Sequence, residues 1–137
     1  MFKTVLFPID QSQESLQAVE TVAKLTKSFN SRLVILSVVE DTTSPEAQAA
    51  NGGMASPEAV AELLKNAQTF FADQQITAET IERVGKPAFV ICDVADDIEA
   101  DLIVMGCRGM GLTQEGIEDS ITIRVINLSP CPVLIVP

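Results

Sequence analysis

Five short apolar runs, separated by segments with helical periodicity, limit the folds open to this chain more than any other feature. The second run, Leu33–Val39, is rich in β-branched residues and apolar on both faces, as expected of a central strand in a parallel sheet. Parallel strands need crossover connections, and helices of the predicted kind supply them. The pattern therefore predicts an α/β fold: a single doubly wound, Rossmann-like domain over 1–137, with a five-stranded parallel sheet and helices on both faces.

The boundaries of these elements follow from periodicity and from turn residues. Strands are expected at 5–9, 33–39, 76–84, 102–105 and 133–136, and helices at 13–29, 57–71, 87–98 and 121–128, with a loop over 41–55. Ser56, Pro57 and Glu58 are typical of a helix start. The helix positions predicted to face the core are Leu16, Val19, Ala23, Thr26, Val60, Leu63, Leu64, Ala67, Phe70, Phe71, Ile91, Val94, Ala95, Ile98, Ile121, Val125 and Leu128.

Composition excludes several classes of function. The net charge of −10 opposes binding to nucleic acids and to anionic membrane surfaces. The absence of His excludes His-based catalytic triads and most zinc geometries, and three cysteines do not form a disulfide framework. No apolar stretch reaches the ~20 residues of a membrane span, and the N-terminal run is too short for a signal peptide. We therefore expect a cytoplasmic protein without a His-based zinc site and without nucleic-acid or membrane partners.

A ligand crevice is expected where the strands end. In parallel α/β sheets, ligands bind at the carboxyl ends of the strands, at the point where the strand order reverses. This rule brings together Asp10, Val38, Val39 and the loop that begins at Gly106. Gly106 and Gly109 follow an apolar strand, so their backbone N–H groups could approach a phosphate closely. Arg108 is the only basic side chain within that loop.

Four short motifs follow one another along nearly the whole chain. They are Val5-Leu-Phe-Pro8-Ile-Asp10-Gln-Ser12, Gly85-Lys-Pro87, Ala100-Asp-Leu-Ile-Val-Met-Gly106 and Cys131-Pro-Val-Leu-Ile-Val136. Together they make the chain resemble the universal stress protein family. The resemblance implies a small cytoplasmic homodimer linked to the stress response, with a regulatory or interaction role and no catalytic residues.

The resemblance also implies an adenine-nucleotide site, for ATP or AMP, with Mg²⁺ accompanying ATP. ATP-binding members carry Gly, two residues, Gly, nine residues, and then Gly-Ser or Gly-Thr. Here Gly106 and Gly109 match the first two positions, but the final pair is Asp119-Ser120. Carried over residue by residue, the nucleotide-binding positions are Pro8, Asp10, Val38, Met105, Gly106, Arg108, Gly109, Asp119, Ser120, Ile121 and Thr122.

Asp119 departs from the family motif in bulk and in charge. A side chain at this position hinders close approach of a phosphate. Like charges about 4 Å apart repel by about 1 kcal/mol in water and about 4 kcal/mol at an effective dielectric of about 20. The expected loss is about one to three decades of affinity, which a bridging metal ion could reverse. Alternatively, Asp119 or Ser120 is simply the N-cap of the following helix.

The other candidate functional residues each have a purely structural alternative. Asp10 could be a general base or a metal ligand, or it could be the N-cap of the first helix, a role that Ser12 could share. Cys107 lies beside Arg108, which suits a redox thiol but equally a small turn residue, whereas Cys92 and Cys131 are predicted to be buried and inert.

Two alternative functions stay open. One is a slow ATPase, although no catalytic base or phosphate-binding clamp is identifiable. The other is a nucleotide-independent dimerisation or adaptor module.

The last strand carries the expected dimer interface. By family resemblance, Val133, Leu134, Ile135 and Val136 would pair antiparallel with the same strand of a second copy. An edge strand with free N–H and C=O groups invites such pairing. The alternative is an edge that the chain's own loop covers.

Overall fold

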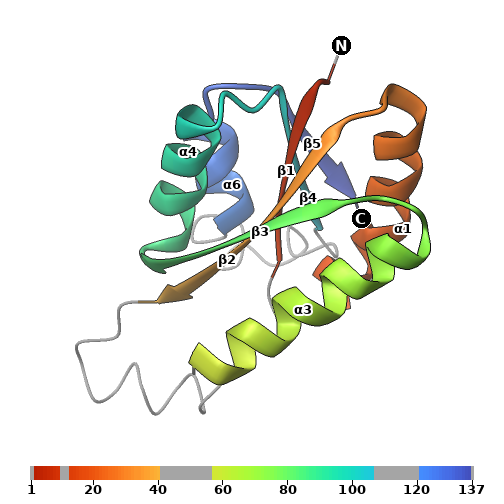
Figure 1. The fold of residues 1–137 in the computed structure, drawn as a ribbon. Coiled ribbons are helices and arrows are strands. Elements are labelled where there is room, and N and C mark those ends of the chain that lie inside the picture. The colour runs from red at the N-terminus through yellow and green to blue at the C-terminus, as the bar shows by residue number, and fades with distance from the viewer. Residues whose placement is uncertain (1, 10–12, 41–56, 107–120, 137) are drawn as a thin grey trace.

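The computed structural model describes residues 2–9, 13–40, 57–106 and 121–136 (Figure 1). Its elements are β1 (Thr4–Pro8), α1 (Gln13–Phe29), β2 (Arg32–Glu40), α3 (Pro57–Asp73), β3 (Ala78–Gly85), α4 (Pro87–Asp97), β4 (Leu102–Gly106), α6 (Ile121–Leu128) and β5 (Val133–Val136). Among these residues, no helix combines the length and apolarity that a membrane crossing requires.

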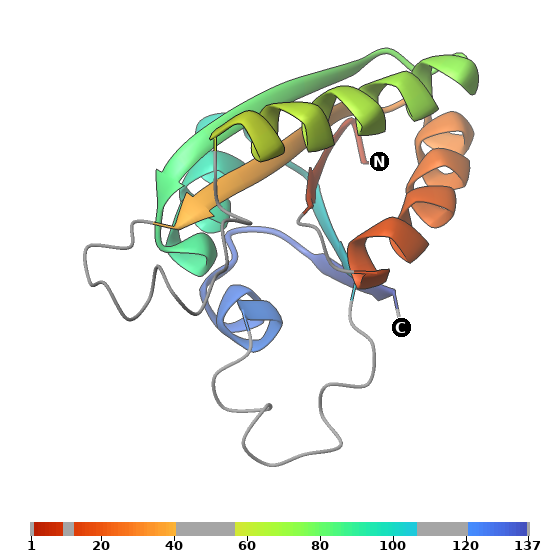
Figure 2. The ribbon, with the colours of Figure 1, turned by 90° about the horizontal axis from the view of Figure 1, so that it is seen from below.

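The strands form one parallel sheet in the order β3-β2-β1-β4-β5. Helices α1 and α3 cover one face, and α4 and α6 cover the other (Figures 1 and 2). From β1 the chain first adds β2 and β3 on one side, and then adds β4 and β5 on the other. The predicted doubly wound α/β fold is confirmed, and the strand order reverses between β1 and β4.

The core consists of two layers, one on each face of the sheet. Successive strand side chains point to opposite faces, so neighbouring residues of one strand enter different layers. Toward α1 and α3 the buried strand residues are Val5, Phe7, Leu33, Ile35, Ala78, Leu102 and Val104. Toward α4 and α6 they are Leu6, Val34, Leu36, Ile103 and Met105. The three central strands are therefore buried on both faces, as the apolar runs predict.

The expected start of β3 at Ile76 is wrong. The N–H groups of Gln75 and Ile76 donate to the carbonyls of Ala72 and Phe71, at 2.9 and 2.8 Å. Gln75 has a φ of 66°, so these bonds form the left-handed closure that commonly ends a helix. Ile76 therefore serves to end α3, and the strand begins two residues later at Ala78.

Two of the helix positions predicted to face the core are exposed instead. Phe70 is 37% exposed, because it lies on the outer side of α3 with its ring edge-on to Phe71, centroids 5.5 Å apart. Leu128 is 48% exposed, because it is the last residue of an eight-residue helix and no further turn covers it. The side chain of Leu16 lies outside the described residues. The other positions are buried or half-buried, as expected.

Thr26 carries a buried hydroxyl in α1 that has no hydrogen-bond partner among the described residues. An unsatisfied buried hydroxyl costs roughly 1–3 kcal/mol relative to an apolar group of the same shape. We expect Thr26→Val to raise the free energy of unfolding by about 1 kcal/mol in urea titrations followed by circular dichroism. Thr77→Val, at an exposed position, is the control and should change little. A less stable Thr26→Val would show that the hydroxyl makes a stabilising bond.

Candidate functional site

The candidate site lies at the edge of the sheet where the parallel strands end, which Figure 2 views from below. Pro8 ends β1 and Gly106 ends β4, so these two residues flank the point where the strand order reverses. The Ile9 N–H donates to the Leu36 carbonyl at 2.8 Å, which continues the β1–β2 pairing one residue past β1. The chain is therefore held in place up to the residue before Asp10.

Asp101 aligns the two strands that flank the site, but from the opposite end. Its carboxylate accepts a bond from the Thr4 N–H at 3.0 Å, and its own N–H donates to the Thr4 carbonyl at 2.8 Å. These bonds set Val5 beside Leu102. The two strands consequently start and end almost level, although nothing in the sequence marks Asp101 for this role.

The described site residues fall into two groups by burial. Pro8 and Met105 are buried, whereas Val38, Gly106, Ile121 and Thr122 are partly exposed. The Met105 side chain belongs to the core under α4 and α6, so only its backbone faces the edge. Pro8, Met105 and Gly106 meet at the β1–β4 reversal. Val38 lies two residues beyond Leu36, the β2 partner of Pro8, and Ile121 and Thr122 begin α6. Asp10, Arg108, Gly109, Asp119 and Ser120 lie outside the described residues, as does Cys107.

The helices α4 and α6 also begin at this edge (Figures 1 and 2). Helix N-termini expose unsatisfied N–H groups and favour negative charge. At the start of α4, Lys86 makes no side-chain capping bond, and Pro87 occupies the first turn. The described part of the edge thus offers apolar surface, backbone donors and the Thr122 hydroxyl. These groups suit the binding of an anion-bearing ligand better than proton transfer.

Comparison with known proteins assigns this geometry to a family. The model of the universal stress protein family matches residues 1–137. Universal stress protein Sll1654 of Synechocystis sp. is 58% identical over 137 residues, which cover all of this chain and 87% of that protein. The chain belongs to the universal stress protein family.

Solved structures of similar proteins share the fold. Hypothetical protein MJ0577 superposes with a TM-score of 0.79 at 27% identity, over 99% of this chain and 96% of that one. A universal stress protein solved in complex with cAMP gives a TM-score of 0.79 at 25% identity, over 99% of this chain and 97% of that one. The sequence-based assignment to the universal stress protein family is confirmed.

Neither described thiol of this universal stress protein lies at the candidate site. Cys92 is buried in the core under α4, and Cys131 is half-buried rather than buried as predicted. Burial is the main cause that raises the pKa of both thiols. For Cys131, a hydrogen bond with the Ser129 hydroxyl lowers the pKa and partly offsets this effect. Both thiols therefore stay protonated at neutral pH, which agrees with an inert role. No group of three or more His, Cys, Asp or Glu in the described ranges could hold a metal ion.

Gly85 ends β3 at the same edge of the sheet and leads into α4. Its φ of +151° is one that residues with side chains rarely adopt, and a Cβ here would lie 2.8 Å from Val90 Cγ2. Gly85 therefore allows the sharp turn that places the first turn of α4 against the sheet. This gives a physical reason for the glycine of the Gly85-Lys-Pro87 motif.

We expect Gly85→Ala to lower the free energy of unfolding by about 1–3 kcal/mol, because the backbone and the Val90 contact are both strained. Urea denaturation followed by circular dichroism measures the loss. In a double-mutant cycle, Val90→Ala should reduce the penalty by removing the contact, and the remaining penalty reports the backbone alone. A loss below about 0.5 kcal/mol for Gly85→Ala would contradict the steric argument.

Proposed function

We propose that the carboxyl edge of this sheet binds an adenine nucleotide, and that the chain is a single-domain regulatory module of the stress response in the cytoplasm, not an enzyme. The observation that carries the proposal is the partly exposed Gly106 at the end of β4, beside Pro8 at the reversal of strand order. This is the place where parallel α/β sheets bind ligands. A similar universal stress protein was solved in complex with cAMP, which supports the ligand class.

Each part of a nucleotide has suitable groups at this edge. Val38 is partly exposed, lies two residues before the end of β2, and offers apolar surface to a base. Gly106 has no side chain to keep a phosphate from its backbone, and α6 begins nearby with Ile121. The positive end of a helix dipole favours a phosphate placed there. The base would therefore lie over β2 and the phosphate over β4.

Asp119 occupies a glycine position of the family's phosphate motif, and this gives the proposed site a preference among adenine nucleotides. In the family pattern this position is a glycine close to the phosphates. A carboxylate there would repel a bound phosphate chain, and the repulsion would be strongest for a triphosphate. A single phosphate carries less charge than a triphosphate and experiences less repulsion. We therefore propose that AMP or cAMP binds better than ATP alone, and that Mg²⁺ narrows the difference by shielding the triphosphate.

We expect Asp119→Gly to tighten ATP binding by about one to three decades, because it removes both the charge and the side chain. Isothermal titration calorimetry with ATP, AMP and cAMP, with and without Mg²⁺, measures the change. Asp119→Asn separates charge from bulk, because it keeps the side chain. Asp73→Asn is the control for net charge, because Asp73 is exposed at the far end of α3.

Two results would overturn the nucleotide proposal. One is no binding of any of the three nucleotides at millimolar concentration, together with no nucleotide released when freshly purified protein is denatured. The other is an Asp119→Gly variant that also fails to bind. Either result would favour the nucleotide-independent adaptor, in which the edge of the sheet serves only the fold.

We also propose that β5 joins two copies of the chain. β5 pairs only with β4 in the described part of the chain, so its other side is a free edge of the sheet. All four of its residues are apolar, and Leu134 is 36% exposed. An apolar edge strand with free backbone groups is suited to pairing with a second copy.

We expect Leu134→Lys to convert the dimer to a monomer, because pairing would bring two like charges together at the two-fold axis. Size-exclusion chromatography with light scattering measures the mass. Val84→Lys is the matched control, because Val84 is 66% exposed on β3 at the opposite edge of the sheet. A Leu134→Lys variant that keeps the wild-type dimer mass would show that another surface joins the copies.

A further inference from the structure

The two free edges of the sheet differ in chemical character. β5 is four residues long and entirely apolar. β3 is eight residues long and pairs only with β2 among the described residues, so its outer side could in principle accept another strand. We call this outer side the β3 edge. The β3 edge carries the greater risk of aggregation, because long free edges promote uncontrolled association.

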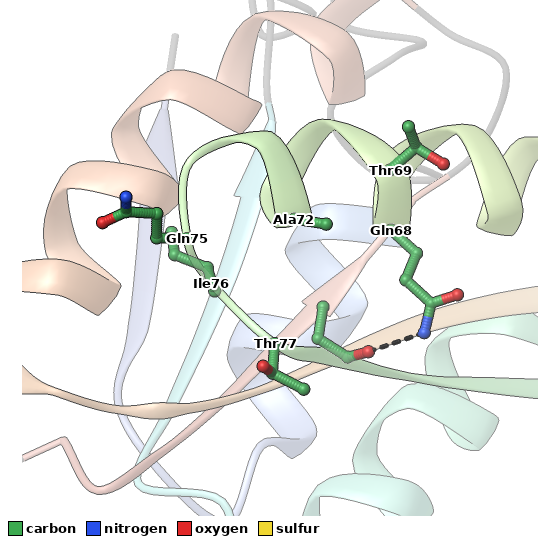
Figure 3. Close-up of a pocket in the computed structure, with 7 residues that line it drawn as sticks. Gln68, Thr69, Ala72, Gln75, Ile76 and Thr77 are labelled. Atoms are coloured by element: carbon green, nitrogen blue, oxygen red, sulfur yellow. Dashed lines mark hydrogen bonds between the residues drawn. The ribbon is translucent and has the colours of Figure 1, made fainter.

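A groove beside the start of β3 gives access to this edge. It encloses about 450 Å³ between the end of α3 and the first residues of the strand, and it is lined by Gln68, Thr69, Ala72, Gln75, Ile76, Thr77 and Ala78. Figure 3 shows the Gln68 side chain reaching across it. Its Nε2 donates a hydrogen bond of 2.8 Å to the Ala78 carbonyl. The side-chain amide thus supplies the kind of donor that an added strand would bring.

Charged side chains occupy the middle of the same strand. Glu79, Glu82 and Arg83 are all exposed. Glu79 forms an ion pair with Arg32 on β2, and Arg83 Nη1 donates to the Glu82 carbonyl at 3.0 Å. A strand added here would place its side chains about 5 Å from these groups and remove water from them. Charges on an edge strand discourage addition for this reason.

The far end of β3 is closed by its backbone. Val84 is the one large apolar side chain exposed on this strand. It is followed by Gly85, the last residue of the strand, whose φ of +151° is one that residues with side chains rarely adopt. Pro87, two residues further on, begins α4 and has no N–H group to donate. Pairing along β3 therefore ends at Gly85.

We propose that Gln68, Glu82 and Arg83 close the β3 edge to strand addition and so confine self-association to the β5 edge. The second half of this statement rests on the proposed β5 dimer. A sheet with one open edge forms a closed pair around a two-fold axis, whereas a sheet with two open edges adds copies without limit. Closing one edge is what makes the other usable for a defined dimer.

The test is a variant that opens the β3 edge without changing net charge: Gln68→Leu, Glu82→Val and Arg83→Thr together. Light scattering across a concentration series should show its mass rising to about twice the wild-type mass or more, with increased thioflavin T fluorescence. Glu62→Gln with Lys65→Gln, two exposed positions on α3, removes the same two charges elsewhere and should keep the wild-type mass. A triple variant that has the wild-type circular dichroism spectrum and mass at all concentrations overturns the proposal.

Two further samples keep the test decisive. If the triple variant does not fold, Glu82→Thr with Arg83→Thr decides, because both positions are exposed and threonine suits a strand. The triple variant combined with Leu134→Lys separates the two edges. It should still associate, whereas Leu134→Lys alone should not. If the wild type proves monomeric, the β5 dimer fails, but a gain in mass of the triple variant still supports a closed β3 edge.

Discussion

Burial of the three central strands on both faces is the constraint on which the rest of this structure depends. Residues of β1, β2 and β4 alternate between two apolar layers, so neither face of these strands tolerates water. Fully burying one Val, Leu or Ile side chain contributes roughly 1.5–3 kcal/mol, so these strands supply a large share of the stabilising free energy. Covering both faces requires helices on both sides, and because these helices connect parallel strands, every strand's carboxyl end lies at one edge. The candidate site is a consequence of that arrangement.

The sequence predicts the layout well because its signals are local. An apolar run of strand length, a capping residue and a helical period can each be recognised within a few residues. Local signals fail where a side chain's surroundings decide its role. Ile76 reads as the start of a strand, yet it ends α3, because the turn at Gln75 returns its N–H to Phe71. Phe70 and Leu128 fit the helical period, yet their side chains are 37% and 48% exposed.

Prediction of the site from sequence has a different limit. Val38 and Gly106 could be assigned to one edge because the rule for parallel sheets depends only on strand direction and order, whereas Pro8 came from the family resemblance. The contact between Asp101 and Thr4 joins residues 97 positions apart and leaves no local pattern. The hydrogen bond from the Gln68 side-chain amide to the Ala78 carbonyl also leaves no sequence signal, because exposed glutamines are common on helices. The roles of Asp10, Arg108, Gly109, Asp119 and Ser120 stay predictions.

The separation between core and edge explains how such a fold could change its ligand without losing its shape. The described site residues that face the edge contribute backbone groups and partly exposed apolar surface, while the buried layers lie behind them. If the proposed site binds a nucleotide, we expect a side chain added at a motif glycine to act on that ligand rather than on the packing of the central strands. Binding is sensitive to such a change, because each ~1.4 kcal/mol alters affinity tenfold, whereas the folded state has several times that margin. Under the proposed function, we expect an aspartate in the phosphate motif to change which nucleotide is preferred rather than the stability of the fold.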